Sequence, residues 1–291
     1  RESYEGNVFS PMGCRSFLSP WKDENGNYKF DGRFNMGVVS LNLPQIGILA
    51  DGDEEKFFQI LHKRLELCKK ALLLRVELLK KITSDVSPIH WQYGAISRLK
   101  PGESIEKFMY GGYATLSLGY IGMYEATLLT KGVSHTTPEG KRFAHRIMDD
   151  LNEHIKKWRE ETNIGFALYG TPAESLTHRF CQKDRSRFGN IKDVTDKGYY
   201  TNSYHVDVRE PINVFDKFAF ESEFEDKSTG GCISYAEIPN MTHNVPAILT
   251  MIEYIYDHIS YGEFNTKLDY CHECGFDGEI VLNKNNEWEC P

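Results

Sequence analysis

The segment VVSLNLP, residues 38–44, predicts a buried strand that ends at Pro44, and a long amphipathic pattern follows it. From Asp53 to about Ile82, apolar residues recur at helical spacing, acidic residues open the pattern, and Lys80 and Lys81 close it. This charge distribution complements the helix dipole, so we expect one long helix here. A strand followed by a long helix is the repeating unit of an α/β fold.

The rest of the chain continues this alternation of strands and helices. The patterns predict helices at residues 116–129, 137–161 and 244–261, a strand at 166–169 that breaks into another helix, and a strand at 231–238. We therefore assign an α/β architecture. Spacing alone leaves open whether its sheet is open or closed.

Composition limits the class of protein and of partner. The 291 residues include 34 basic and 42 acidic side chains, giving a net charge of −8 without a basic tract, which argues against nucleic acid as the main partner. No run of about 18 apolar residues occurs, so we expect no membrane span, and the N-terminus lacks the pattern of a signal peptide. Seven cysteines, three of them in a metal-binding pattern, favour a reducing cytoplasm over a disulfide scaffold.

The last residues carry the most specific pattern. Cys271 and Cys274 form a Cys-x2-Cys knuckle, and fifteen residues separate it from Cys290. This spacing is typical of a ribbon that holds a structural zinc, with a short hairpin over residues 279–289; the alternative is free thiols in a disordered tail. Because the second knuckle has only its first cysteine and the chain begins at Arg1, we expect a piece of a longer protein.

Two segments near the N-terminus offer candidate chemistry. In SPMGCR, residues 10–15, proline and glycine place Cys14 at a turn, and the neighbouring Arg15 favours a thiolate. In GRFNMG, residues 32–37, Asn35 stands at the mouth of the predicted strand, where its amide can hydrogen-bond a ligand hydroxyl. Each has an ordinary alternative, since most single cysteines are small buried hydrophobic residues and Asn is a common turn residue.

The segment FALYGTPAES, residues 166–175, combines a strand, a glycine and a helix start. Free N–H groups at a helix start attract anions, so this corner is a candidate phosphate site. The alternative is a capping box between Thr171 and Glu174, whose carboxylate would oppose a phosphate. The pattern alone does not decide between the two. Five scattered histidines show no metal-ligand spacing: His90, His135, His178, His205 and His243.

Taken together, these segments resemble the C-terminal half of an anaerobic, class III ribonucleoside-triphosphate reductase, a family of glycyl radical enzymes. The resemblance covers nearly the whole chain, and the order and spacing of its motifs make it specific. It rests on MGCR (12–15), NMG (35–37) with NLP (42–44), LGYIG (118–122), YGTPAES (169–175) and the cysteine knuckles.

The resemblance implies a fold and a division of the chain. Residues 1–265 are expected to form part of a ten-stranded glycyl-radical-enzyme α/β barrel, with a cysteine-bearing finger loop inside it. Residues 266–291 are expected to form a truncated zinc ribbon.

The resemblance also implies roles for individual residues. Cys14 matches the cysteine that becomes a thiyl radical and abstracts the ribose 3′ hydrogen, Asn35 matches a residue that contacts ribose hydroxyls, and Tyr169 matches an active-site tyrosine. The turn expected to hold the substrate phosphates comprises Gly170, Thr171, Pro172, Ala173, Glu174 and Ser175. The expected zinc ligands are Cys271, Cys274 and Cys290.

The implied cofactors and partners are those of the family. They are a ribonucleoside triphosphate substrate, formate or a protein dithiol as reductant, a radical SAM iron–sulfur activating enzyme and a second copy of the full-length chain. The family's glycyl radical lies in an Arg-x-Cys-Gly-Tyr loop, which does not occur within residues 1–291. We therefore expect the radical beyond residue 291 and expect this chain to be inactive alone.

Two other hypotheses remain at the level of sequence. One is another glycyl radical enzyme, such as a formate-lyase-like acyltransferase, which uses adjacent cysteines where Cys14 has none. The other is a non-catalytic binding module with a zinc ribbon. The binding module predicts that replacing Cys14 in the full-length protein leaves function intact, whereas the radical hypothesis predicts complete loss.

Overall fold

The computed structural model divides the chain into two compact units. Unit 1 comprises residues 1–211 and 223–232, and unit 2 comprises residues 212–222 and 233–291. The described residues are 16–18, 20–170, 173, 175–239, 241–266, 269–278, 280–285 and 287–290.

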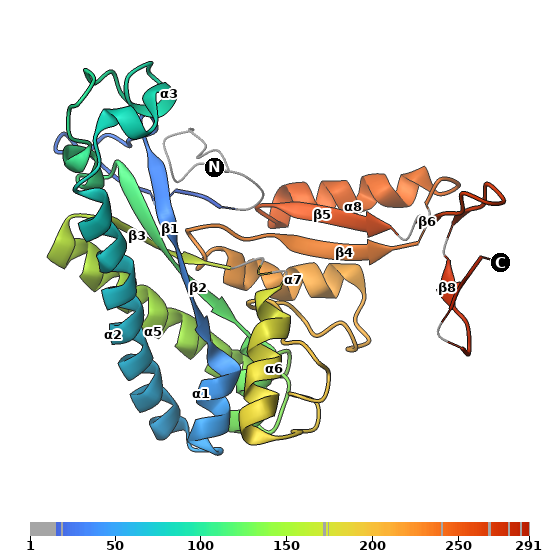
Figure 1. Cartoon of the computed structure of the whole chain (residues 1–291). Coiled ribbons are helices and arrows are strands. Elements are labelled where there is room, and N and C mark those ends of the chain that lie inside the picture. The colour runs from blue at the N-terminus through green and yellow to red at the C-terminus, as the bar shows by residue number, and fades with distance from the viewer. Residues whose placement is uncertain are drawn as a thin grey trace. The chain divides into compact units, whose positions relative to one another are not determined.

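A three-stranded parallel sheet forms the centre of unit 1. Its strands are β1 (Phe34–Asn42), β2 (Ala114–Ile121) and β3 (Gly165–Tyr169), in the order β1-β2-β3 (Figure 1). Because consecutive parallel strands are neighbours, each connection must cross back over the sheet, and the crossovers contain the long helices. The α/β class expected from the sequence is therefore confirmed.

The first crossover begins with a helix that the sequence analysis missed. The strand predicted at residues 38–43 is present within β1, but α1 (Leu43–Ala50) starts at once, with Pro44 in its first turn and the Asn42 side chain accepting from Gln45 N–H. Asp53 then caps α2 (Glu54–Leu79), whose bounds and acidic start match the predicted long helix.

The helix predicted at residues 116–129 is wrong in its first half. Residues 114–121 form β2, every residue of which is buried, and only then does α4 (Met123–Lys131) begin. Thr115, Ser117 and Gly119 alternate with Leu116, Leu118 and Tyr120, which is the period-2 pattern of a strand; the predicted helix wrongly extended the pattern of α4 back over it.

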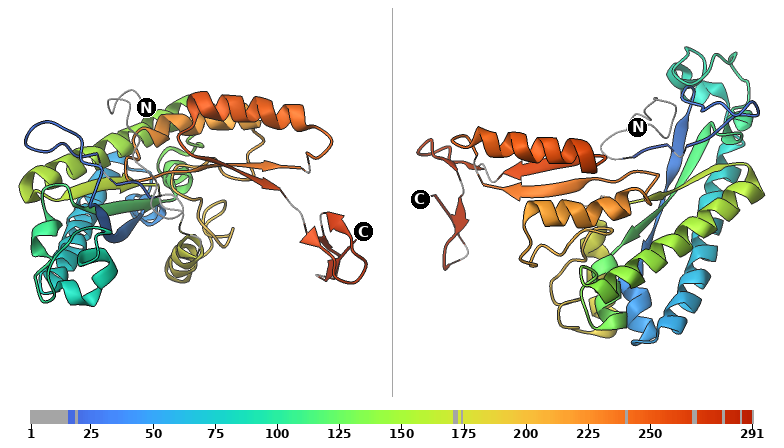
Figure 2. Two further views of the ribbon diagram at one scale, coloured as in Figure 1. Left: turned by 90° about the horizontal axis from the view of Figure 1, so that it is seen from above. Right: turned by 180° about the vertical axis from the view of Figure 1, so that it is seen from behind.

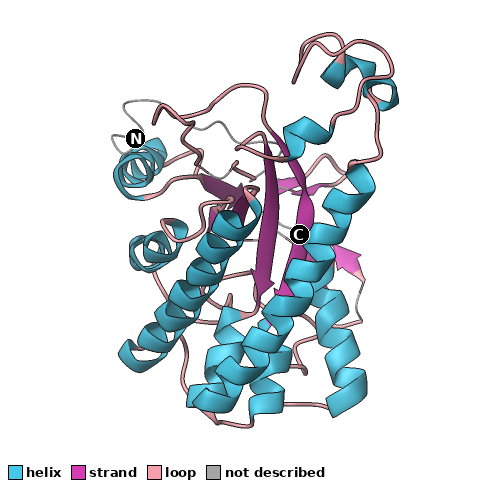
Figure 3. Cartoon of the chain, turned by 90° about the vertical axis from the view of Figure 1, so that its left-hand side faces the viewer, coloured by secondary structure: helices cyan, strands magenta, loops and turns pink. Residues whose placement is uncertain are grey.

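The second crossover contains α5 (Pro138–Thr162), which begins at the predicted cap Thr137. Helices α2 and α5 lie side by side on one face of the sheet (Figure 3). Ion pairs join Glu54 to Arg146 and Lys69 to Glu161, and each pair is separated by 92 positions. Because the offset is the same at both pairs, the two helices are parallel and each residue of α2 lies beside the residue of α5 that is 92 positions later.

The remaining elements of this part of the chain are shorter. The N-cap of helix α6 is Ser175, four residues later than the cap predicted at Thr171. The bounds are η2 (Ser84–Val86), α3 (Pro88–Trp91), η3 (Glu106–Met109), α6 (Leu176–Phe188) and α7 (Val214–Glu225). No helix among the described residues is long and apolar enough to cross a membrane.

Unit 2 is built on a second parallel pair, β4 (Ser234–Ile238) and β5 (Gly262–Thr266), connected by α8 (Val245–His258) (Figure 2). The strand and helix predicted at 231–238 and 244–261 are thereby confirmed. Its small core joins Phe218 of α7 to Ala236 of β4 and to Ile259.

Two short antiparallel pairs follow near the C-terminus. The second pair matches the hairpin predicted over residues 279–289. The four strands are β6 (Asp269–Tyr270), β7 (Asp277–Gly278), β8 (Val281–Leu282) and β9 (Trp288–Glu289), paired β6 with β7 and β8 with β9.

Candidate functional site

The two faces of the β1-β2-β3 sheet differ in chemistry. Residues paired in register share a face, and side chains alternate between faces along a strand. One face is apolar, its β2 and β3 residues Leu116, Leu118, Phe166 and Leu168 are fully buried, and Trp158 of α5 packs against Phe166 with ring centroids 5.5 Å apart. The opposite face, called the polar face here, carries Asn35, Thr115, Ser117, Gly119, Ala167 and Tyr169.

Asn35 is held in place at the start of the polar face. Its Nδ2 donates to Ser117 Oγ at 2.8 Å, and its Oδ1 accepts from the Gly37 N–H at 2.6 Å across a bulge in β1. The neighbouring Thr115 is fully buried, and its Oγ1 has no hydrogen-bond partner among the described residues. At this end of the polar face, the oriented amide of Asn35 therefore lies beside the Thr115 hydroxyl, which has no hydrogen-bond partner among the described residues.

Tyr169 and Gly170 lie at the other end, where β3 finishes. Tyr169 is half-buried, and the Gly170 N–H donates to Gly231 O at 2.9 Å. A Cβ on Gly170 would meet the Tyr204 ring at 3.1 Å and Ser203 Oγ at 3.6 Å, so a side chain here would press on its neighbours. Close packing therefore favours the glycine at this position.

Asn35 and Tyr169 share a face but are not neighbours. Asn35 of β1 pairs with Thr115 of β2, and Thr115 pairs with Gly165 of β3. Tyr169 lies four residues after Gly165 along β3. At 3.3 Å per residue this is about 13 Å along the strand.

The chain that follows Cys14 returns to the carboxyl end of β3. Phe17 N–H donates to Gly230 O at 2.8 Å, and Gly230 N–H donates to Leu168 O at 2.7 Å. Gly230 therefore connects the backbone of Phe17 to Leu168, the residue before Tyr169, through two hydrogen bonds.

Several predicted site residues lie outside the described residues: Cys14, Thr171, Pro172 and Glu174. Of the predicted phosphate turn, Ala173 has a left-handed backbone (φ 28°), and Ser175 is exposed directly before α6. The structure thus describes three of the six residues of that turn: Gly170, Ala173 and Ser175.

A buried ionic network, which the sequence analysis did not predict, supports the carboxyl end of β2. Lys197 Nζ lies 2.6 Å from Glu125 Oε1 and 2.5 Å from Asp207 Oδ2, and all three side chains are at most 3% exposed. Burial alone would raise the pKa of Asp207, but hydrogen bonds from Arg209 and Lys197 outweigh it and lower that pKa. Thr201 N–H and Oγ1 both donate to Glu125 Oε1 at 2.8 Å.

This network fixes the loop that borders the site. Gly122 N–H donates to Thr201 O at 2.9 Å and Met123 N–H donates to Ser203 O at 3.0 Å, so residues 201–203 run along the end of β2. The same loop supplies Tyr204 and Ser203 to the surroundings of Gly170.

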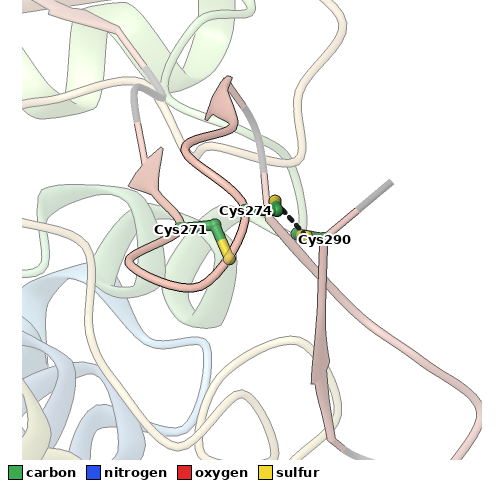
Figure 4. A group of neighbouring side chains, drawn as sticks. All are labelled: Cys271, Cys274 and Cys290. Atoms are coloured by element: carbon green, nitrogen blue, oxygen red, sulfur yellow. Dashed lines mark hydrogen bonds between the residues drawn. The ribbon is translucent and has the colours of Figure 1, made fainter.

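The three cysteines of the C-terminal knuckles converge (Figure 4). Their Sγ atoms all lie within 4.8 Å of one another, with Cys274 and Cys290 at 3.3 Å. Backbone N–H groups of Cys274 and Glu273 lower the pKa of Cys271 to about 7, whereas the neighbouring thiols raise the pKa of Cys290 to about 12.

A zinc ion fits this geometry. With Zn–S bonds of about 2.3 Å, tetrahedral sulfur ligands are about 3.8 Å apart, a spacing within the range of the three thiols. The remaining described cysteines are all buried: Cys68, Cys181 and Cys232.

Parallel strands with helices on an apolar face, a polar opposite face and a glycine turn at the strand ends define a protein of the parallel α/β class. In this class, ligands bind at the carboxyl ends of the strands.

Comparison with known proteins identifies the family. The family model "Anaerobic ribonucleoside-triphosphate reductase" matches residues 1–291, and the chain belongs to that family. The anaerobic ribonucleoside-triphosphate reductase of Salmonella typhimurium is 42% identical over 289 residues, which are 98% of this chain and 40% of that protein. The corresponding protein of phage T4 is 42% identical over 281 residues, 95% of this chain and 45% of that protein.

Solved structures lead to the same family. The anaerobic ribonucleotide reductase from Thermotoga maritima with dATP bound in the specificity site matches with a TM-score of 0.63 and 26% identity, over 82% of this chain and 38% of that one. The same enzyme in complex with dATP and CTP matches with a TM-score of 0.68 over 95% of this chain and 44% of that one; at 22% identity this match supports the fold alone. The chain therefore spans about 40% of the length of its curated relatives.

Proposed function

We propose that this chain forms the substrate-reducing part of an enzyme that converts ribonucleoside triphosphates to 2′-deoxyribonucleoside triphosphates without oxygen. The observation that carries the proposal is the hydrogen-bond path from Phe17, three residues after Cys14, through Gly230 to β3 beside Tyr169. In the proposal, the three residues from Phe17 back to Cys14, which can span about 10 Å, carry the thiol from the carboxyl end of β3 along the polar face to the ribose.

The proposed substrate lies along the polar face. Asn35 contacts the ribose hydroxyls through its amide, which Ser117 and Gly37 already orient. Tyr169 lines the opposite end, where the turn from Gly170 to Ser175 holds the phosphates. The separation of about 13 Å between the two ends suits a ligand as long as an extended nucleoside triphosphate.

The proposed chemistry uses Cys14 as the hydrogen acceptor. The Cys14 sulfur, as a thiyl radical, takes the 3′ hydrogen, forming an S–H bond and leaving a carbon radical at C3′. The 2′-hydroxyl then leaves as water after taking up a proton, and a reductant supplies the two electrons that balance its loss. We propose formate for that role, with release of carbon dioxide.

A glycyl radical outside residues 1–291 supplies the unpaired electron when it is present. The chain's own residues bind and orient the ribose, place the thiol close to the C–H bond and keep the site dry, which are the requirements of such a step.

The finer architecture belongs to the same proposal. We propose that residues 1–265 form part of a ten-stranded barrel with a cysteine finger loop. Residues 266–291 form a ribbon in which Cys271, Cys274 and Cys290 bind a structural zinc ion. The complete enzyme is a cytoplasmic homodimer activated by a radical SAM iron–sulfur protein.

Exchange of Cys14 for serine in the complete, activated enzyme tests the function. We expect Cys14→Ser to abolish formation of deoxynucleotides from ribonucleoside triphosphates and formate under anaerobic conditions. Cys68→Ala is the matched control, because Cys68 is buried in α2 and should leave turnover intact. Turnover by Cys14→Ser at the level of the control would refute the proposal and favour the non-catalytic binding module.

A further inference from the structure

His62, Asp150 and His154 form a second group of metal-ligating side chains, in unit 1. His62 projects from α2, and the other two project from α5 at positions i and i+4. One donor atom from each side chain lies within 4.8 Å of the other two. The pair Asp150 and His154 was not predicted from the sequence, where only the spacing between histidines was interpreted.

The helix pair holds these three residues in place. His62 and His154 are separated by the same 92 positions as the ion pairs Glu54–Arg146 and Lys69–Glu161, which lie about two turns before and after them. The two imidazole ring centroids are 5.0 Å apart. The cluster therefore lies in the interface between α2 and α5. The ion pairs before and after it hold the two helix backbones, and with them the three side chains, at a fixed separation.

The hydrogen bonds of the cluster determine which ring nitrogen of His154 keeps a lone pair for a metal ion. The Asp150 main-chain oxygen can only accept, so the His154 Nδ1–H donates to it at 2.9 Å and the ring's lone pair is on Nε2. Metal-binding histidines commonly make such a bond with the nitrogen that does not bind the metal. His62 Nε2 lies 2.8 Å from Asp150 Oδ2, and the buried Asp150 Oδ1 lies 3.3 Å from His154 Nδ1, so both carboxylate oxygens face the two imidazoles.

We propose that His62, Asp150 and His154 bind a first-row divalent transition cation such as Zn²⁺ or Co²⁺. Two imidazoles and one carboxylate are a donor set that such cations accept, with water completing the coordination. The half-exposed His62 leaves that side open to solvent. The bound cation links α2 to α5 and is independent of the three-thiol cluster.

Titration of the 291-residue chain with Co²⁺ under anaerobic conditions distinguishes this site from the thiols. Cobalt bound to thiolates shows an intense sulfur-to-metal charge-transfer band, whereas cobalt bound to imidazole and carboxylate shows only weak visible d–d bands. We expect the wild-type chain to bind two equivalents, one with each spectrum.

Two substitutions at the cluster and one control make the test specific. His62→Gln and Asp150→Asn should weaken the equivalent without the charge-transfer band by about tenfold or more, since even loss of an outer-shell partner costs 10–100-fold. His90→Gln, an exposed histidine outside the cluster, should bind as the wild type does. Circular dichroism of the metal-free variants checks that their helices are intact.

The proposal is overturned if all bound cobalt shows the charge-transfer band. It is also overturned if the two cluster variants and His90→Gln titrate alike. Either result would assign the three side chains to an ion-pair cluster between the helices.

Discussion

Replacement of Lys197 by methionine is expected to destabilise unit 1 by about 3–5 kcal/mol. Methionine keeps much of the apolar stem but removes the cation that Glu125 and Asp207 share at 2.6 and 2.5 Å. Two carboxylates would then remain in the interior without their common partner. Asp207 retains Arg209, and Glu125 retains two hydrogen bonds from Thr201, so we do not expect a larger loss.

Urea unfolding followed by circular dichroism measures this loss. At an m-value of about 1–3 kcal/mol per molar urea, the midpoint should fall by at least about 1 M. Lys192→Met, at an exposed lysine in the same loop, is the matched control and should change stability by no more than about 0.5 kcal/mol.

A double variant tests the reason for the loss. Glu125→Gln combined with Lys197→Met removes one buried charge together with its partner, so its midpoint should lie above that of Lys197→Met alone. If Lys197→Met unfolds at the same urea concentration as Lys192→Met, the network contributes no net stability and the argument is refuted.

Three further outcomes are expected. Gly230→Ala should cost about 1–3 kcal/mol by overpacking, since its Cβ would lie 2.8 Å from Leu168 O; an unchanged urea midpoint would contradict this. The pKa of Asp207 is lower in the folded than in the unfolded protein, so its stabilisation is complete above the ordinary aspartate pKa of 3.8 and is lost as the pH falls further. Urea midpoints from about pH 5 to about pH 2 should therefore fall less steeply for Asp207→Asn than for the wild type. If zinc is bound, a chelator should change the fluorescence of Trp288 in β9, and an unchanged spectrum would count against the zinc proposal.

Local patterns predicted the elements whose chemistry is local. Helices α2 and α5 were recognised because Asp53 and Thr137 cap them and their apolar stripes keep a helical period. Strand β2 was not recognised, although Thr115, Ser117 and Gly119 alternate with Leu116, Leu118 and Tyr120, because its apolar residues were assigned to the helix that follows it. Helix α1 was missed because Pro44, taken as a strand end, instead occupies the first turn of a helix.

The candidate site was only partly accessible from the sequence. Asn35 and Tyr169 were identified, but their placement at opposite ends of one face depends on the register of three strands. The network of Glu125, Lys197 and Asp207 could not be predicted, because charged residues 72 positions apart usually lie on the surface. Convergence of Cys271 with Cys274 and Cys290 followed from their spacing, since a short hairpin brings them together.

Strand β1 has one side without a partner strand in the described part of the chain, because it is an outer strand of its sheet. At the carboxyl end of the other outer strand, β3, Gly230 N–H donates to Leu168 O, and the Gly170 N–H just after the strand donates to Gly231 O. Arg75 of α2 donates to one main-chain oxygen of β1, Val38 O, at 3.4 Å. Main-chain groups of an outer strand that have no such partner are a template for strands of other molecules. We expect the isolated chain to aggregate by adding strands at β1, and a lysine introduced along this edge should raise its solubility. In a closed barrel the same edge would pair within the molecule, so barrel closure would also protect against aggregation.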